Sequence, residues 1–528
     1  MKNNKNKMKS QHVPGIFNDV MGPIMRGPSS SHTAAAHRIG SMIKQIRKPD
    51  YSGVTVKFDK TGALATTYLG QGSAMGLAGG LLGLEITDHE IINYEKQVEE
   101  RDLTIDYIIT NIENKHPNAY QISVEYPDGE ELQILAISTG GGMFDIVKWD
   151  GFEVSLKGDF YETILILNNG NVDIEEVINA HFSDIIIYKS LKTENNLLLN
   201  VKSGANISAE IDELLTPFSS TYLKFDLVPV MPAPSATKIE LPFTTVDEML
   251  QLASAENLSL SELAINYENA RTGLSAEAIL KKMEEIVLIT KEGINAGLKG
   301  TVYEDRILGA QSPLIEKAEK EGRIPKTINS SIIAYTSALM EVKSSMGVIV
   351  AAPTAGSCGT IGGALFGSLN EKEFDLREMT KAFLAAGLIG VFIAWKYTFA
   401  AEEGGCQVET GSSAAMAAAG LVELNGGTAK QAVDAASMAL QNQLGLICDP
   451  VAVRVEVPCL GKNIMAASNA YNSFIMAISG FDAVIPYSEV IDTMKTVGET
   501  LPSSLCCTGL GGLAQTETGK CLNQKFNF

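Results

Sequence analysis

Short runs of apolar residues, several of them alternating with polar ones, recur through the first 157 residues of the chain. Residues 53–59 (GVTVKFD), 121–127 (QISVEYP) and 132–139 (LQILAIST) have the short, β-branched pattern of strands. Helical stretches and glycine-rich turns such as STGGG separate them. This mixture predicts an α+β domain over residues 1–157.

Residues 158–231 alternate strand-like and helical patterns in a fixed order. The order is strand, helix, strand, strand, helix, strand, at YETILILN, DIEEVINAHF, DIIIYKSLK, NLLLNVKS, SAEIDELLTPF and YLKFDLVPV. It is typical of the ferredoxin-like split motif. We expect a small module here, either a regulatory module of the ACT type or a structural spacer, because a fold does not fix a function.

A linker is predicted at residues 232–241, where prolines interrupt the pattern, and helical periodicity follows over residues 242–528. Many of these helices are rich in Ala, Gly and Ser, as in ETGSSAAMAAAGLVEL, which allows close packing. We therefore predict an all-helical C-terminal domain. The longest apolar run, residues 382–395, is too short to span a bilayer and predicts a buried helix.

Charge narrows the classes of partner. The chain carries 42 Lys and Arg against 62 Asp and Glu, a net charge of −20. Such an acidic chain is a poor match for nucleic acid or an anionic membrane, so we expect neither as a partner.

The N-terminus is basic and polar without a following apolar stretch, unlike a secretory signal. We expect a cytoplasmic homodimer with a small-molecule substrate.

The seven cysteines all follow residue 350 and the six histidines all precede residue 182. A mixed Cys/His zinc site therefore cannot form within the C-terminal half. Cys406, Cys448 and Cys459 lie beside Gly, Asp-Pro or Pro at predicted turns and helix ends, where backbone N–H groups can bond to sulfur. Their spacing fits neither a zinc ribbon nor a ferredoxin, and buried structural thiols are the alternative.

Polar side chains are concentrated just before one predicted helix. The stretch GPSSSHTAAAHRIG, residues 27–40, follows a Gly-Pro turn and leads into a helix predicted over residues 34–46. One serine would suffice as an N-cap. The alternative is an anion site, because a helix N-terminus offers unpaired N–H groups and a positive dipole end. The residues concerned are Ser29, Ser30, Ser31, His32 and Thr33.

Taken together, several of these motifs resemble one enzyme family. Five stretches are similar, in this order, to signatures of the iron–sulfur-dependent bacterial L-serine dehydratases, or L-serine ammonia-lyases. They are MGPIMRGPSSSHTAAAHRIG, APTAGSCGTIGG, GCQVETGSSAAMAAAGL, CDPVAVRVEVPC and TGLGGLA. The resemblance covers nearly the whole chain. It implies that the β and α domains of that family are fused in one polypeptide.

The resemblance also implies a cofactor and a reaction. In that family three cysteines, matching Cys406, Cys448 and Cys459, hold a 4Fe–4S cluster with one iron open to substrate, and no pyridoxal phosphate is implied. The open iron acts as a Lewis acid on the serine β-hydroxyl. A base removes the α-proton, water leaves, and the resulting aminoacrylate rearranges to an imine that hydrolyses to pyruvate and ammonia.

The same resemblance implies site residues. The substrate-binding set is Ser29, Ser30, Ser31, Thr33 and Thr354, and the residues in blocks with catalytic roles are His32, Gln71, Ser73 and Arg454. In several members a C-terminal cysteine closes the open iron when substrate is absent. Cys521 is the candidate for this role, with Cys506 and Cys507 as alternatives.

The chain departs from the family pattern in three blocks. The family's GHGTD is GQGSA at residues 70–74, so Gln71 replaces a proton-transfer histidine, and an amide cannot act as a base. CDPVAGLVEVPC becomes CDPVAVRVEVPC, with Val453 and Arg454, and Cys507 replaces an acidic residue. The base must then be another group, and His32, His37 or a cysteine thiolate are the candidates.

These departures leave three hypotheses. The first is an L-serine lyase, and the second keeps the cluster but acts on another β-hydroxy acid or amino acid. In the second, Arg454 would contact an additional anionic group, whereas an exposed arginine is the simpler alternative. The third is an amino-acid sensor without catalytic activity.

Overall fold

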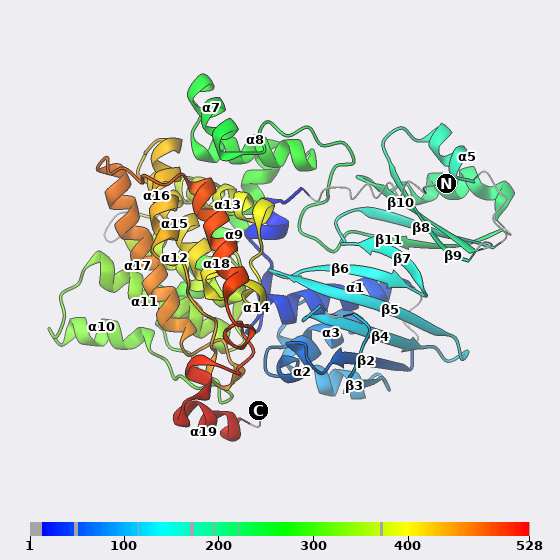
Figure 1. Ribbon diagram of the computed structural model, residues 1–528, viewed down its shortest axis with the longest axis horizontal. Helices are drawn as coiled ribbons and strands as arrows, with labels where there is room; N and C mark the ends of the chain where they lie inside the picture. The colour runs from blue at the N-terminus through cyan, green and yellow to red at the C-terminus, as the bar shows by residue number, and fades with distance from the viewer. Residues whose placement is uncertain are drawn as a thin grey trace.

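Two β-sheets stand beside a body of packed helices (Figure 1). The structure is a computed structural model that describes residues 13–46, 51–114, 116–168, 174–193, 196–219, 221–369 and 373–526. Some of the predicted parts lie outside the described residues. These are residues 1–12 of the first predicted domain, the first residue of the helix predicted at 173–182, and residues 527–528. A sheet-containing N-terminal region followed by a helical region confirms the predicted multi-domain organisation.

The larger sheet has six strands in the order β3-β2-β4-β5-β6-β7. Only β2 and β3 are parallel, and the other neighbours are antiparallel. Alternating apolar residues such as Val54, Val56 and Phe58 are buried, as the sequence pattern predicts. The bounds are β2 Gly53–Asp59, β3 Thr104–Thr110, β4 Ala119–Glu125, β5 Glu131–Gly140, β6 Met143–Trp149 and β7 Phe152–Leu156.

Helices α1 (Ala35–Ile46) and α3 (Ser73–Leu82) pack closely on each other. Glycines permit this approach, because a Cβ on Gly76 would lie 2.1 Å from the carbonyl oxygen of Thr33 and one on Gly80 2.1 Å from that of His37. The packing brings the GQGSA segment against the GPSSSHT segment. The shorter helices of this region are α2 Leu64–Thr67, η3 His89–Asn93 and α4 Tyr94–Glu99.

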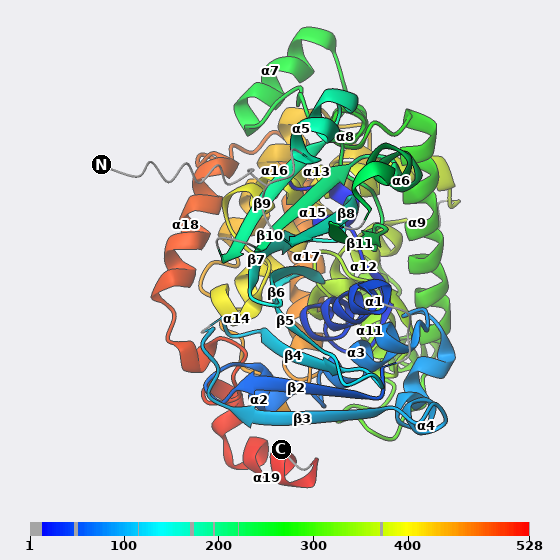
Figure 2. The same cartoon turned by 90° about the vertical axis from the view of Figure 1, so that its right-hand side faces the viewer.

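The second sheet belongs to a four-stranded module with the predicted order of strands and helices. Its strand order is β11-β8-β10-β9, and all neighbours are antiparallel. Strand β7 of the larger sheet contacts β9, so the two sheets adjoin (Figure 2). The bounds are β8 Tyr161–Asn168, α5 Ile174–His181, β9 Ile186–Thr193, β10 Asn196–Ser203, α6 Ser208–Leu215 and β11 Tyr222–Leu227.

Helix α15 (Thr410–Leu424) lies at the centre of the helical body and is buried from Thr410 to Val422. Its small side chains let α12, α13, α16 and α17 pack around it, as the Ala- and Gly-rich sequence predicts. The bounds are α7 Val246–Glu256, α8 Leu260–Thr272, α9 Ala276–Leu298, α10 Ser312–Lys320, α11 Ile328–Ser344, α12 Cys358–Ser368, α13 Leu376–Lys396, α14 Ala401–Gly404, α16 Ala429–Gln441, α17 Cys459–Ile478, α18 Tyr487–Thr500 and α19 Glu517–Lys525.

The N-terminal segment packs against the helical body, which differs from its predicted place in the first domain. Residues Ile16–Val20 form a π-helical turn against α13, and their apolar side chains join the helical core. Strand β1 (Ile24–Arg26) then pairs antiparallel with β12 (Val348–Val350). The C-terminal region is therefore not all-helical as predicted, because three residues between α11 and α12 complete this ladder.

Helix α13 contains the longest apolar run of the sequence. Among the described residues it is the one helix whose length and composition would allow it to cross a membrane. However, 78% of its most apolar window is buried inside the protein. Its apolar side chains are accounted for by contacts with α8, α9 and α15, which agrees with the predicted buried helix.

A buried ion pair within α8 includes the carboxylate that binds the N-terminal segment, and breaking the pair should destabilise the fold. Glu268 and Arg271 pair at 3.2 Å with side-chain exposures of 0% and 1%, and Glu268 also accepts the backbone N–H of Ile16. Glu268→Gln leaves the arginine charge buried without its partner, at a cost of about 3–5 kcal/mol. Thermal unfolding measures this, and the Glu268→Leu/Arg271→Met double variant, which removes both charges, should lose much less. Equal losses in the two proteins would contradict this explanation.

Candidate active site

The hydroxyl groups of GPSSSHT do not cap a helix. Residues Ser30–Ala34 form a π-helical turn before α1, and the N-cap residue Ser29 makes no side-chain capping bond. The side chains point to other elements, since Ser30 Oγ accepts the backbone N–H of Ala355 at 3.1 Å. Ser31 Oγ donates to Glu402 at 3.0 Å, and Ser138 Oγ donates to the Ser31 carbonyl at 2.7 Å. The N-cap alternative is therefore wrong, and the turn joins the sheet region to the helical body.

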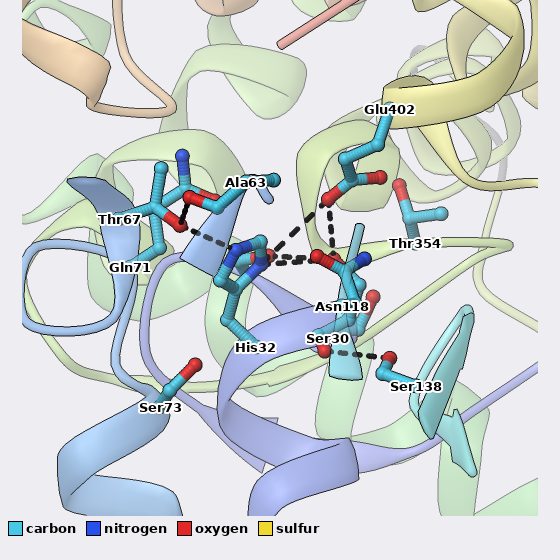
Figure 3. A network of polar contacts seen from close by, with 12 residues as sticks. Ser30, His32, Ala63, Thr67, Gln71, Ser73, Asn118, Ser138, Thr354 and Glu402 are labelled. Carbon is cyan, nitrogen blue, oxygen red and sulfur yellow. Dashed lines mark hydrogen bonds and ion pairs between the residues drawn. The ribbon is translucent and has the colours of Figure 1, made fainter. Parts of the chain in front are cut away.

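His32 lies at the centre of this network and is fully buried (Figure 3). Its Nε2 lies 2.8 Å from Thr67 Oγ1. Its Nδ1 lies 3.0 Å from both Ser29 Oγ and Ser31 Oγ and 3.7 Å from a carboxylate oxygen of Glu402. The ring is thus held from both sides.

The hydrogen bonds assign the tautomer of His32. The Thr67 hydroxyl donates to the carbonyl of Ala63 at 2.7 Å, so it accepts from His32 and the ring proton resides on Nε2. Because the Ser31 hydroxyl donates to Glu402, Ser29 is the donor to Nδ1. Nδ1 therefore carries the basic lone pair and faces the serines and Glu402.

Burial lowers the pKa of His32 from its ordinary value, and the nearby charge of Glu402 opposes this shift. A lowered pKa keeps the imidazole neutral at pH 7, the form in which a histidine can accept a proton. Burial also lowers the pKa of His37, so the contacts of the two rings, and not the pKa direction, favour His32 over the other histidine considered. The Nε2 of His37 contacts the Leu84 carbonyl at 2.7 Å instead.

Asn118 adds an unpaired acceptor to the same site. It is 1% exposed, and its side-chain oxygen has no hydrogen-bond partner among the described residues. Figure 3 shows its amide on the side of His32 where Glu402 and Ser30 also lie. A buried amide oxygen without a partner costs free energy, so this position favours binding of a ligand that donates a hydrogen bond.

The structure places Gln71, Ser73 and Thr33 around the start of α3. Thr33 Oγ1 donates to the Gln71 carbonyl at 3.0 Å, and the Gln71 side chain donates to the carbonyl of Val453 at 3.0 Å. Ser73 Oγ lies 3.1 Å from Tyr120 Oη. Gln71 and Thr33 are thus committed to protein contacts that hold the two motifs together.

Thr354 connects the serine turn to the cysteines. Its hydroxyl donates to Glu409 at 2.5 Å, and it precedes Ala355, whose N–H binds Ser30. Burial raises the pKa of Glu409 to about 7. The Glu409 carboxylate and the sulfurs of Cys406 and Cys448 lie within 4.8 Å of one another, which is a candidate metal centre.

Two of the three predicted ligand cysteines, Cys406 and Cys448, belong to this centre, and Cys459 lies outside the group of atoms within 4.8 Å of one another. Cys406, Cys448 and Cys507 are free thiols in one apolar cluster, in which Cys448 interacts with the other two. Cys459, at the start of α17, is buried in the adjoining cluster with Cys358. Cys448 and Cys459 flank one loop, whereas Cys406 and Cys507 come from segments distant from it in the sequence.

Both lysines near the cysteines are engaged with backbone carbonyls. Lys462 Nζ binds the Ile447 carbonyl at 2.6 Å and Asp449 at 2.9 Å, and it lies 3.7 Å from Cys406 Sγ. Lys343 binds the carbonyl of Val455.

Hydrogen bonds to Cys406 and Cys507, together with burial, raise the pKa of Cys448, and burial raises that of Cys459.

Two predicted site residues make other contacts. The Arg454 guanidinium binds the carbonyl and a carboxylate oxygen of Asp305, each at 2.6 Å, and lies 4.4 Å from the centroid of the Phe526 ring. Cys521 is exposed on α19. Cys507, named as its rival from the sequence, is the C-terminal thiol that the structure places beside Cys448.

Sequence reasoning missed Glu402, Thr67, Asn118, Glu409 and Lys462. Glu402 and Glu409 flank the recognised Cys406, so their closeness to a ligand cysteine was an available signal. Thr67 lies on the short helix α2 and Asn118 lies just before strand β4, and neither has a motif around it. Their roles depend on tertiary contacts alone.

Comparisons with known proteins place the helical region in a family. The sequence model described as "Serine dehydratase alpha chain" matches residues 255–514. The chain is 37% identical over 285 residues to the probable L-serine dehydratase alpha chain of Bacillus subtilis, covering 54% of this chain and 95% of that one. It is 35% identical over 284 residues to the L-serine dehydratase alpha chain of Peptoniphilus asaccharolyticus, covering 53% and 97%.

A longer relative shows the same extent of similarity. The L-serine dehydratase TdcG of Escherichia coli is 31% identical over 287 residues, which is 53% of this chain and 63% of that protein. Residues 255–514 contain Cys406, Cys448, Cys459 and Cys507 together with Glu402 and Glu409. The chain therefore belongs to the serine dehydratase alpha chain family, that of the bacterial L-serine dehydratases.

Proposed function

We propose that this protein is a lyase that converts L-serine to pyruvate and ammonia, using a 4Fe–4S cluster held by Cys406, Cys448 and Cys459. The observation that carries the proposal is the meeting of buried thiols with a neutral buried histidine, bridged by Thr354 and Glu409. The three relatives reported above carry L-serine dehydratase names. Our proposal extends that activity to this chain.

The donor set suits an iron–sulfur cluster. Several thiols are buried together, and the structure resists ionising Cys448 and Cys459 in the absence of a cation. A metal centre supplies the positive charge that makes thiolates stable in such a place. Lys462, 3.7 Å from Cys406 Sγ, adds a donor to sulfur of the kind that tunes iron–sulfur centres.

When bound, the cluster supplies a Lewis acid for the β-hydroxyl of serine. The chain's own residues would perform the remaining tasks. The lone pair on His32 Nδ1, which accepts from Ser29 in the structure, takes the α-proton, and Thr67 keeps the ring proton on Nε2 so that Nδ1 is the basic nitrogen. The unpaired oxygen of Asn118 accepts from the substrate ammonium, and the Ser30 hydroxyl donates to its carboxylate.

The departures from the family pattern do not favour a larger anionic substrate. Arg454 already binds Asp305, so its charge is compensated within the protein. Gln71 binds Val453, so the loss of a histidine there leaves His32 as the base. We also propose that residues 158–231 form an ACT-like regulatory module, which their β-α-β-β-α-β order and antiparallel sheet support, and that the enzyme is a cytoplasmic homodimer.

Anaerobic purification followed by a substrate panel tests the proposed function. We expect brown protein with about four irons per chain. We also expect L-serine to be converted to pyruvate with a higher kcat/KM than that of L-threonine, L-cysteine or hydroxy dicarboxylic acids. A higher kcat/KM for another member of the panel would favour the second hypothesis. Binding of serine to the loaded protein without turnover would favour a sensor, and folded protein without iron would rule out the cluster.

Removing the Thr67 hydroxyl should slow the reaction without displacing iron. Thr67→Val keeps the size of the side chain but leaves the His32 Nε2–H buried without an acceptor. An unpaired buried donor costs about 1–3 kcal/mol, which favours the other tautomer and should reduce kcat about tenfold or more. The matched control is Thr66→Val, because the Thr66 hydroxyl also donates to the Ala63 carbonyl, whereas Thr67 is the residue that accepts from His32 Nε2. Equal kcat values for the two variants would contradict the tautomer assignment.

A further inference from the structure

Two departures from the family pattern meet in the structure. Val453 and Ala452 lie in the loop between Cys448 and Cys459, with φ angles of +54° and +53°. This left-handed conformation suits glycine and is unfavourable for a β-branched residue. Something must therefore hold Val453 in a conformation that its side chain disfavours.

Gln71 provides that restraint. Its side-chain amide donates to the carbonyl of Val453 at 3.0 Å, and the residue is 1% exposed. Gln71 is itself fixed, because its carbonyl accepts from Thr33 at 3.0 Å. The next residue, Gly72, has a φ of +91° and lies so close that a Cβ there would be 2.2 Å from Thr33 Oγ1. The restraint is therefore anchored on the N-terminal sheet region.

The rest of the loop transmits this position to the ligand cysteines. Val451 N–H donates to the Val457 carbonyl at 2.8 Å, and Arg454 N–H donates to the Val451 carbonyl at 3.1 Å. On the other side Arg454 is tied to Asp305. The loop begins after Cys448 and ends one residue after Val457, at the proline preceding Cys459. A change at Val453 therefore moves the segment that sets both sulfurs.

We propose that Gln71 acts as a positioning residue for the loop between Cys448 and Cys459, by holding Val453 in its left-handed turn. A glycine at position 453 would adopt the left-handed turn without a restraint. With valine the turn persists because Gln71 binds its carbonyl across the boundary between the sheet region and the helical body. The clamp itself does not depend on iron, and only its effect on the cluster rests on the proposed function.

Four proteins test the clamp: the wild type, Gln71→Met, Val453→Gly and the double variant. Amide hydrogen exchange of residues 449–458 is measured first in metal-free protein. We expect Gln71→Met to accelerate exchange about five- to tenfold, as the loss of a hydrogen bond worth about 1 kcal/mol or slightly more predicts. In the Val453→Gly background, the same substitution should change exchange less than about twofold, because glycine keeps the turn without help.

The second measurement is the rate at which a chelator removes iron from anaerobically loaded protein. Gln71→Met should accelerate iron loss by a similar factor, and Val453→Gly should rescue it. The matched control is Gln443→Met, since Gln443 is similarly buried but its side chain bonds to nothing among the described residues. This variant should leave the exchange of residues 449–458 unchanged.

The outcomes separate the clamp from the proposed function. Unchanged exchange in Gln71→Met, or the same acceleration in the wild-type and Val453→Gly backgrounds, overturns the clamp even if the cluster loads and serine is converted. If the effect of Gln71→Met on amide exchange depends on the residue at position 453 in a protein that never binds iron, the clamp is supported and the proposed function is contradicted. Acceleration in Gln443→Met equal to that in Gln71→Met would show a general effect of losing a buried amide, and would also overturn the clamp.

Discussion

Cys448→Ser protein, purified without oxygen, is expected to lack both the visible iron–sulfur absorption and lyase activity. Cys448 is the thiol in contact with Cys406 and Cys507, and it lies within 4.8 Å of the Glu409 carboxylate. A serine hydroxyl does not replace a thiolate as a ligand for iron. Because Lewis-acid stabilisation is worth several kcal/mol, activity should fall by ~10³-fold or more.

Two other cysteines provide matched controls for this experiment. Cys521 is exposed on α19, so Cys521→Ser should retain iron and kcat. Cys358 is buried against the sulfur of Met340 at 3.8 Å, so Cys358→Ser should retain the cluster at a stability cost of about 1–3 kcal/mol for an unpaired hydroxyl. A fully loaded, active Cys448→Ser protein would show that the ligand assignment is wrong.

His32→Asn should reduce kcat by about 10²–10⁴-fold while iron content stays unchanged, because it removes the proposed base and not a ligand. Steady-state rates measured beside iron analysis separate these two effects. The control is His37→Asn, which changes a histidine in the same helical segment whose ring contacts the Leu84 carbonyl instead. Comparable kcat losses in both variants would contradict the assignment of the base.

The pH dependence of the wild-type enzyme provides an independent check. The base must be neutral, so activity is present above the pKa of His32 and is lost as the pH falls through it. Burial lowers that pKa from 6.5, so the acidic limb of kcat/KM should lie below pH 6.5. Glu402 raises the pKa of His32, and Glu402→Gln should therefore move the limb to lower pH. A limb above pH 6.5, or a shift to higher pH, would exclude His32.

The local pattern of apolar and polar residues was sufficient to predict secondary-structure elements of this fold. Strand β2 occupies residues 53–59 as predicted, because Val54, Val56 and Phe58 alternate with polar residues and the sheet has one buried face. The Ala- and Gly-rich segment at residues 409–424 predicted the central helix α15. Motifs identified Cys406, Cys448, Cys459 and His32 as candidates, because their residue types carry recognisable chemistry.

Tertiary structure alone decided how those candidates meet. The serines of GPSSSHT looked locally like N-caps, but their hydroxyls bind His32, Glu402 and Ala355, the last two of which lie far away in the sequence. Gln71 and Val453 are separated by 382 positions and form one hydrogen bond. Hydrophobic periodicity records which face of an element is buried, and it contains no information about which distant element covers that face. Site geometry is set by that packing, so it had to come from the folded chain.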